Sequence, residues 1–348
     1  KSDFTVTGRL ADYRNLLPSK KGAPARLTGT LSSNLIDIGD MLVIDKSAPL
    51  IKPWDLNEPL KNLPVPPTLS AELALKLGKI AFGRLAADSA VGSVNLSKGV
   101  LSLTGLTIAA YKGTLTGATK LDFTNPDRIA YDGGFNINKL DAATFISSLF
   151  DTGDNFRGEF SSSLSFNGAG LDSVTFLKNL KGNGEATFVK GQFVNWEFTK
   201  GLGKSLKFLN FDTLDFESLK SGFTVADQRV ITPSIVVKTA YGDLNMAGST
   251  GFDTTLDFDI SYKLNAKAVS LANRNNLGDL AALISGSSTP ELYILAKGTL
   301  KQPAFTIDKT RSGKAVKEKL RNEAEKLLQK QDSDVQKAGQ KLLKKLFK

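Results

Sequence analysis

The segment Thr254–Val269, TTLDFDISYKLNAKAV, alternates between polar and apolar residues from Thr255 onward. Side chains of a β-strand point to opposite faces in turn, so this period of two predicts one long strand with an apolar face and a polar face. The residues expected on its apolar face are Leu256, Phe258, Ile260, Tyr262, Leu264, Ala266 and Ala268. Similar runs recur along the chain, and their apolar faces have to be kept from water.

Short strands separated by turn residues account for most of the sequence. Runs such as Val100–Leu103, Thr114–Phe123 and Glu159–Phe166 are bounded by turns rich in Gly, Asn and Pro. Helices are expected over Ala142–Phe150, Asp172–Leu180, Gly201–Leu209 and Leu277–Ile284 and through the last 35 or so residues. A sheet with one apolar face can pack on a second sheet, close into a barrel or curl into an open trough.

Proline and charge divide the chain into four predicted parts. Residues 1–47 form an N-terminal β segment that ends a preceding repeat, and the Pro-rich residues 48–67 form a connector. Residues 68–308 form the main β domain. Residues 309–348 form a helical tail with 13 basic and 5 acidic residues, while the rest of the chain is nearly neutral, which disfavours a nucleic-acid-binding body.

The residue types that are absent exclude several chemistries. The chain has no Cys and no His, so it offers no thiol or imidazole for nucleophilic, acid–base or metal-binding roles. The carboxylates of Asp253, Asp257 and Asp259 fit a solvated face better than a metal site. We therefore expect no enzyme, no catalytic residues, no metal and no cofactor. No run of 18 apolar residues is present, and a start at Lys1 without Met indicates a fragment or mature segment.

One stretch of the chain is repeated. The sequence VLSLTGLTIAAY, which ends at Tyr111, is similar to VITPSIVVKTAY, which ends at Tyr241. This similarity predicts that a hairpin-rich unit was used twice.

Several segments resemble the AsmA-like family of bacterial envelope proteins, in particular its C-terminal AsmA region. The segments are LPVPPTLSAELALKLGKIAF, VNLSKGVLSLTGLTIAAYKGTLTGATKLDF, FNINKLDAATFISSLF, SFNGAGLDSVTFLKNLKGNGEATFVKGQFVNWEF and the closing KGTLKQPAFTID with LLKKLF. The resemblance covers roughly residues 60 to 348 and consists of Gly, Pro and apolar patterns. It implies a periplasmic body anchored to the inner membrane by an N-terminal segment that this chain lacks, and a long β groove related to bridge-like lipid-transfer proteins.

Together these observations favour a mainly β fold in which a long, curled antiparallel sheet forms an open apolar groove. The residues expected to line this groove are Leu256, Phe258, Ile260, Leu264, Phe188, Val194, Trp196, Phe198, Leu292 and Ile294. For Trp196, a place in the hydrophobic core as an anchoring side chain fits the sequence as well as a place in the groove lining. The basic amphipathic tail fits either a membrane surface or a cap on the end of the sheet. Its candidates for membrane contact are Lys341, Lys344, Lys345, Leu346 and Phe347.

The function expected from this fold is non-enzymatic lipid binding or transfer in the bacterial envelope. Phospholipid or another acyl lipid would move along the groove between the inner and outer membranes, whose surfaces are expected partners. The alternative is a periplasmic scaffold or assembly factor for outer-membrane biogenesis that acts through an envelope protein partner. A glycan-binding β solenoid is a third reading, which the scattered two Trp and six Tyr disfavour.

Overall fold

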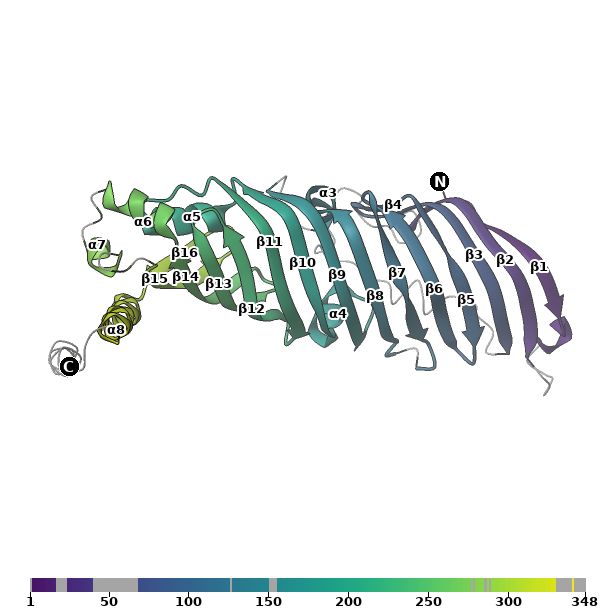
Figure 1. The fold of residues 1–348 in the computed structure, drawn as a ribbon. Coiled ribbons are helices and arrows are strands. Elements are labelled where there is room, and N and C mark those ends of the chain that lie inside the picture. Colours follow the sequence, from purple (N-terminus) through teal and green to yellow (C-terminus); the bar gives the residue numbers. More distant parts are fainter. Residues whose placement is uncertain are drawn as a thin grey trace. The chain divides into compact units, whose positions relative to one another are not determined.

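The fold is described from a computed structural model of the full chain. The described residues are 2–16, 24–39, 68–125, 127–149, 155–275, 277, 279–284, 287, 289–329 and 340. Within them, sixteen strands form one sheet that is mostly antiparallel and does not close (Figure 1). The expectation of a mainly β protein with one long sheet and short helices is confirmed. The predicted connector, residues 48–67, lies outside the described residues.

The strands follow one another along the sheet almost in sequence order, and tight turns join many of the neighbours (Figure 1). The strands are β1 (Thr5–Ala11), β2 (Ala25–Asp37), β3 (Leu69–Phe82), β4 (Leu85–Ala87), β5 (Ser89–Ser97), β6 (Val100–Ala110), β7 (Gly113–Asp122), β8 (Ala130–Asp141), β9 (Phe156–Ala169), β10 (Lys181–Val194), β11 (Thr213–Ala226), β12 (Arg229–Thr239), β13 (Gly242–Gly251), β14 (Thr255–Leu264), β15 (Glu291–Thr299) and β16 (Pro303–Ile307). Only β4 leaves this order, as it pairs with the end of β3.

Helices occupy some of the strand connections and follow the last strand. They are the 3-10 turn η1 (Tyr13–Leu16) and the helices α3 (Ala142–Leu149), α4 (Ser173–Asn179), α5 (Glu197–Leu206), α6 (Ala266–Asn273), α7 (Asp279–Ile284) and α8 (Lys309–Leu328). Asp172 begins α4 by accepting hydrogen bonds from the backbone N–H groups of Val174 and Thr175. The expected helices near 142, 172 and 277 are confirmed, and α5 begins four residues earlier than expected.

Two details of the expected strands are wrong. The strand predicted to run through Ala266 and Ala268 ends at Leu264, because the side chain of Asn265 accepts a hydrogen bond from Ala268 N at 3.1 Å and starts α6. The sheet is also not antiparallel throughout, since β2 and β3 are parallel. A parallel pair needs a long connection that returns the chain to the same end, and about thirty residues separate these strands.

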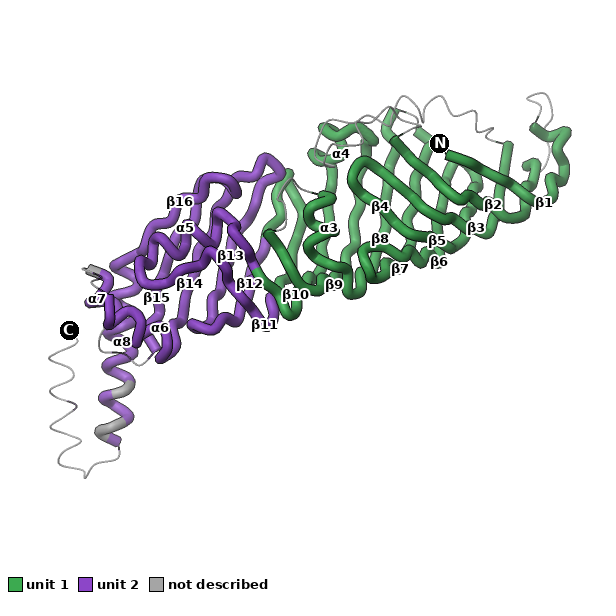
Figure 2. Tube along the Cα trace, turned by 90° about the horizontal axis from the view of Figure 1, so that it is seen from above, with its two compact units in different colours: residues 1–192, 220–231 green, residues 193–219, 232–348 purple. Residues whose placement is uncertain are grey.

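The chain divides into two compact units (Figure 2). Unit 1 comprises residues 1–192 and 220–231, and unit 2 comprises residues 193–219 and 232–348. The division falls inside residues 68–308, for which one domain is expected.

Unit 2 has a packed core on one face of its strands, in which the apolar side chains of β14 and β15 are buried. On β14, Ile260 lies opposite Met246 of β13 and Ile294 of β15, and Tyr262 lies opposite Leu292. Gly201 of α5 lies so close to the ring of Phe305 that a β-carbon there would come within 2.7 Å of it. This helix therefore packs tightly on the sheet, and the apolar parity of β14 is buried beneath protein.

The two similar sequence stretches fold as matching hairpins. In unit 1, β6 and β7 turn at Tyr111, whose carbonyl accepts a hydrogen bond from Asp141 N. In unit 2, β12 turns into β13 at Tyr241, whose carbonyl accepts a hydrogen bond from Asn265 N. Asp141 and Asn265 each end the strand that follows the hairpin and cap the next helix. The match therefore extends over three strands and a helix.

We expect the buried phenol of Tyr262 to make unit 2 sensitive to alkali. Burial raises the pKa of Tyr262 to about 12, and its hydroxyl lies 3.1 Å from Thr239 Oγ1. An unfolded tyrosine ionises near pH 10. The stabilisation is therefore complete below pH 10 and decreases by about 1.4 kcal/mol per pH unit as the pH rises towards 12. Urea unfolding at pH 9.5, 10.5 and 11.5 measures this loss.

The variant Tyr262→Phe removes this contribution, so its stability should fall less steeply over the same range. Tyr13→Phe is the matched control, because Tyr13 is exposed, and it should follow the wild type. Equal slopes for the wild type and Tyr262→Phe would contradict the assignment.

Candidate functional site

The strands of unit 1 place apolar side chains in continuous rows across one face of the sheet. Residues that pair across neighbouring strands point to the same side, so the register defines these rows. Three of them cross six strands as Ala71–Leu96–Leu101–Leu121–Tyr131–Gly168, Leu73–Val94–Leu103–Thr119–Gly133–Phe166 and Leu77–Ala90–Ile108–Leu115–Ile137–Ser162. We call this side the apolar face. None of these positions carries a charge, and only Thr119 and Ser162 have aliphatic hydroxyl groups.

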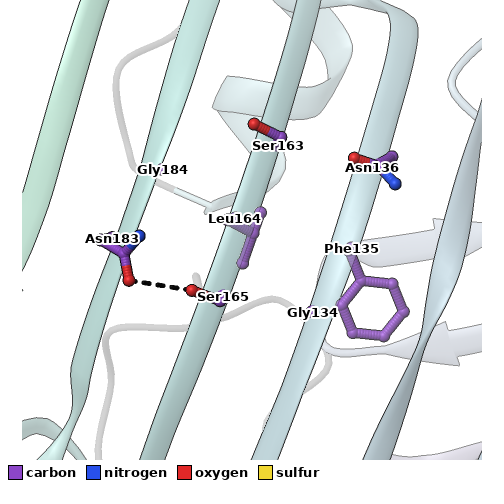
Figure 3. Close-up of a pocket in the computed structure, with 8 residues that line it drawn as sticks. All are labelled: Gly134, Phe135, Asn136, Ser163, Leu164, Ser165, Asn183 and Gly184. Carbon is purple, nitrogen blue, oxygen red and sulfur yellow. Dashed lines mark hydrogen bonds between the residues drawn. The ribbon is translucent and has the colours of Figure 1, made fainter.

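The opposite side of the same strands is polar. One of its rows runs Glu72–Asn95–Ser102–Lys120–Asp132–Asn167. A depression of ≈ 310 Å³ between β8, β9 and β10 is lined by Gly134, Phe135, Asn136, Ser163, Leu164, Ser165, Asn183 and Gly184 (Figure 3). Ser165 Oγ donates a hydrogen bond to Asn183 Oδ1 at 2.9 Å. This wide and shallow hollow offers hydroxyl and amide groups and no charged side chain.

Two helices pack on the apolar face at opposite ends of β9. The ring of Phe145 from α3 lies 5.5 Å from the ring of Phe160, near the start of β9. The ring of Phe176 from α4 stacks on Tyr131, which lies opposite Gly168 near the end of β9. Gly168 leaves room for this ring, because a β-carbon there would come within 2.3 Å of the Tyr131 hydroxyl and the ring would have to shift. The helices thus cover the two margins of the apolar face at β9.

Large apolar side chains of unit 1 remain half-buried on this face. Leu164 of β9 is one of them and lies opposite Phe135, whose ring stacks on that of Phe166 at 6.1 Å. Others are Leu77, Val94, Leu96, Leu101, Leu103, Ile108, Leu115, Leu121, Phe160 and Phe188. No described helix covers the full length of these strands. The described protein therefore shields the apolar face only in part.

Most of the lining residues expected from the sequence lie instead in the core of unit 2. Leu256, Phe258, Ile260, Leu264, Leu292 and Ile294 share one face, as expected, and every one of them is buried. Ile260, Leu264, Leu292 and Ile294 are 0% exposed. Hydrocarbon could contact these side chains only if the protein groups that cover them moved away.

The remaining four expected lining residues have different environments. Phe188 in unit 1 is half-buried on β10, with its ring 4.7 Å from Phe160. Val194 is half-buried at the end of β10, where the strand stops. Trp196 and Phe198 are not on the strand, because Trp196 is the N-cap residue of α5 and Phe198 lies inside that helix. The rings of Trp196 and Phe198 stack at 5.0 Å, which fits the alternative of a core anchor.

The start of the basic tail is attached to unit 2. Arg311 of α8 pairs with Asp259 at 2.6 Å and lies over the ring of Tyr293, and Ser312 is fully buried. Lys319 Nζ donates hydrogen bonds to Thr289. This half of α8 therefore packs on the sheet, as a cap would. The membrane-contact candidates Lys341, Lys344, Lys345, Leu346 and Phe347 lie outside the described residues.

The described residues contain no cluster of acidic side chains that could hold a metal ion. Two aspartates of the segment Thr254–Val269 form ion pairs instead. Asp257 pairs with Lys297, and Asp259 pairs with Arg311. Among the described helices, none is long and apolar enough to cross a bilayer.

No protein-family model, no curated protein and no solved structure matches the chain. The candidate site therefore rests on its own geometry.

Of the half-buried face of unit 1, the sequence-based prediction contained only Phe188, because it rested on long alternating strands. The strands of this face contain the same alternation, but Gly and Thr interrupt it at Gly92, Gly117, Thr119 and Gly133. The best available signal is the combination of these small residues with large apolar ones on one parity, because small residues leave space between the larger side chains.

Truncation of Ile260 measures whether the face of β14 is core. We expect Ile260→Ala to lower the free energy of unfolding by about 2–5 kcal/mol, because the vacated space is enclosed by protein. Ile231→Ala is the matched control, since Ile231 is 41% exposed on β12, and it should cost less than about 1 kcal/mol. Denaturant unfolding followed by circular dichroism provides both values. Similar small losses for the two variants would show that Ile260 is not enclosed.

Proposed function

We propose that this protein binds the acyl chains of phospholipids on the apolar face of unit 1, between α3 and α4, and serves lipid transfer without catalysis. The observation that carries the proposal is the contrast between the units. In unit 2 the side chains of β14 and β15 on the apolar face are buried beneath protein, whereas in unit 1 many large side chains of the corresponding face stay half-buried, although Tyr131 and Ile137 are buried. Hydrocarbon is the ligand class that this surface fits, because acyl chains need neither charge nor hydrogen-bonding partners.

The energetics of hydrocarbon burial support this choice. Moving one methylene group from water to an apolar environment is favourable by about 0.8 kcal/mol of free energy. An acyl chain that covers several rows is therefore held without any specific contact. The three rows offer no charged side chain that hydrocarbon would have to desolvate. The same uniformity along β5 to β9 allows a lipid to shift along the face without breaking a particular interaction.

The cellular setting belongs to the same proposal. We infer an AsmA-like protein of the periplasm, anchored to the inner membrane by a segment outside this chain, that carries phospholipid between the inner and outer membranes. The sequence resemblance supports this placement, and a protein with one apolar and one polar sheet face suits an aqueous space between two membranes. Headgroups would remain in water beyond the margins that α3 and α4 cover.

The test compares two neighbouring residues of β9 that point to opposite faces. Leu164→Lys places a charge on the apolar face, and Ser163→Lys places the same charge on the polar face, where Ser163 is exposed. The full chain is purified from a two-membrane bacterium, and the lipid bound per protein is measured by mass spectrometry. We expect phospholipid in the wild type and in Ser163→Lys, and at least a fivefold lower content in Leu164→Lys.

Circular dichroism melting of all three proteins shows whether they are equally folded. If Leu164→Lys is too unstable to compare, Leu164→Ser provides a milder loss of apolar surface at the same site. A wild-type protein without lipid, or full loading of the folded Leu164 variants, would contradict the proposal. Either result would favour the alternative of an envelope scaffold.

A further inference from the structure

The hydroxyl group of Tyr111 joins the helix α3 to the short strand β4, which lie at the same edge of the sheet in unit 1 (Figure 1). The backbone N–H of Ala86 in β4 donates a hydrogen bond to this hydroxyl at 3.0 Å, and the hydroxyl donates one to Ser148 Oγ in α3 at 3.0 Å. Ser148 Oγ in turn donates to the backbone carbonyl of Phe145 at 2.6 Å. Ser148 is buried, so water competes little for the hydrogen bond between the two hydroxyl groups.

The helix that these hydrogen bonds hold covers one end of the apolar face. The ring of Phe145 lies 5.5 Å from the ring of Tyr111 and also 5.5 Å from the ring of Phe160. Phe160 continues the face to Phe188, whose ring is 4.7 Å away. Leu140, which lies opposite Phe160 on β8, is completely buried. If α3 moved away, the apolar face would extend through these side chains to the edge of the sheet.

The helix α3 buries few large side chains of its own. Its buried residues are Ala142 and Ser148, and its three large apolar side chains are half-buried, namely Phe145, Ile146 and Leu149. By contrast, α5 in unit 2 buries a phenylalanine and two leucines. Segments that bury little apolar surface open at a lower free energy than the rest of a protein. Opening of α3 therefore requires less free energy than opening of α5, and the polar link to Tyr111 contributes more to holding α3 in place.

The two ends of α3 are held by different contacts. At its start, the carboxylate of Asp141 accepts a hydrogen bond from Thr144 N at 3.1 Å and pairs with Lys112 at 2.9 Å. The backbone N–H of Asp141 also donates to the carbonyl of Tyr111. Near the other end, among the described residues, the link from Ser148 to Tyr111 is the side-chain hydrogen bond that reaches another element. The contacts at Asp141 can thus stay in place while the end with Ser148 moves.

The second copy of the hairpin module lacks this link. Tyr241 occupies the position of Tyr111, but its hydroxyl makes no hydrogen bond to any described residue. Instead, Lys267 Nζ of α6 lies 4.9 Å from the centre of the Tyr241 ring. The turn and the helix of the second copy form without a hydroxyl link, so the module does not require it for folding. The link is a feature of unit 1, where the apolar face is only partly shielded.

We propose that α3 is a lid on the apolar face of unit 1 and that the hydroxyl of Tyr111 is its latch. When the latch opens, acyl chains enter and leave at the edge of the sheet beside Phe160. The latch controls the rate of lipid exchange, while the rows of apolar side chains determine the affinity. A single hydrogen bond suits this role because its net contribution is small and it re-forms readily. The inference rests on the proposed lipid binding and adds its regulation.

The first measurement tests whether the hydroxyl holds α3. Tyr111→Phe keeps the ring and removes the latch, and hydrogen exchange of the full chain, followed by mass spectrometry, measures how often α3 opens. We expect the amides of residues 145–149 to exchange at least threefold faster than in the wild type, as the loss of one hydrogen bond predicts. Ser148→Ala removes the same link from the side of α3 and should have the same effect. Tyr241→Phe is the matched control, since it makes the same change in the second copy, and it should leave this exchange unchanged.

The second measurement follows lipid exchange. The probe is phosphatidylglycerol with a pyrene-labelled acyl chain, which the full chain takes up from phosphatidylcholine vesicles. We expect Tyr111→Phe to take it up at least threefold faster than the wild type and to reach the same bound amount. Tyr241→Phe should match the wild type in both rate and amount. A merely structural role of Tyr111 would lower the bound amount and would not raise the rate.

Circular dichroism melting shows whether the variants that are compared are folded. Unchanged exchange of α3 in both Tyr111→Phe and Ser148→Ala would overturn the lid and leave the lipid site standing. Faster exchange of α3 with an unchanged rate of lipid uptake would do the same. A wild type that takes up no lipid, although α3 exchanges faster in Tyr111→Phe, would overturn the lipid site itself and with it the role of the lid.

Discussion

The period-two arrangement of side chains is the constraint on which the rest of the structure depends. Because neighbouring strands pair in register, the apolar residues of many strands collect on one side, as the row from Leu73 to Phe166 shows. That side has to be shielded from water. Unit 2 does so with protein, and its Ile260 and Ile294 are completely buried. In the described part of unit 1, α3 and α4 cover the margins of the apolar face at β9, and the remaining half-buried apolar surface is the basis of the proposed lipid site.

The helices that shield the sheet are positioned by residues at the ends of strands. Asp172 and Asn265 accept hydrogen bonds from the first helical N–H groups, so each helix begins where its strand or turn stops. Close packing then depends on small residues, as with Gly168 beneath Tyr131 and Gly201 beside Phe305. A few polar caps and glycines therefore decide which parts of the apolar side are covered. The apolar side of the sheet outside these covered parts follows from strand alternation alone.

Much of the secondary structure could be predicted from the sequence because alternation and helix caps are local signals. The mainly β fold and the helices after Asp141 and Asp172 follow from them. Local signals failed where two structures fit the same pattern, as at Ala266 and Ala268, whose spacing suits a strand until Asn265 starts a helix. The degree of burial could not be predicted, because it depends on which helix covers a strand. Leu256 and Leu164 have similar sequence surroundings, yet one is core and the other half-buried.

The duplicated hairpin has a consequence for how such a chain can evolve. Each copy consists of strands adjacent along the polypeptide, and its cap closes back onto its own turn, as Asp141 does on Tyr111 and Asn265 on Tyr241. Stability in this kind of architecture is a sum of nearest-neighbour terms rather than the property of one shared centre. Inserting or deleting a whole module would thus leave the remaining modules foldable. Length becomes a trait that natural selection can adjust in discrete steps, one hairpin module at a time.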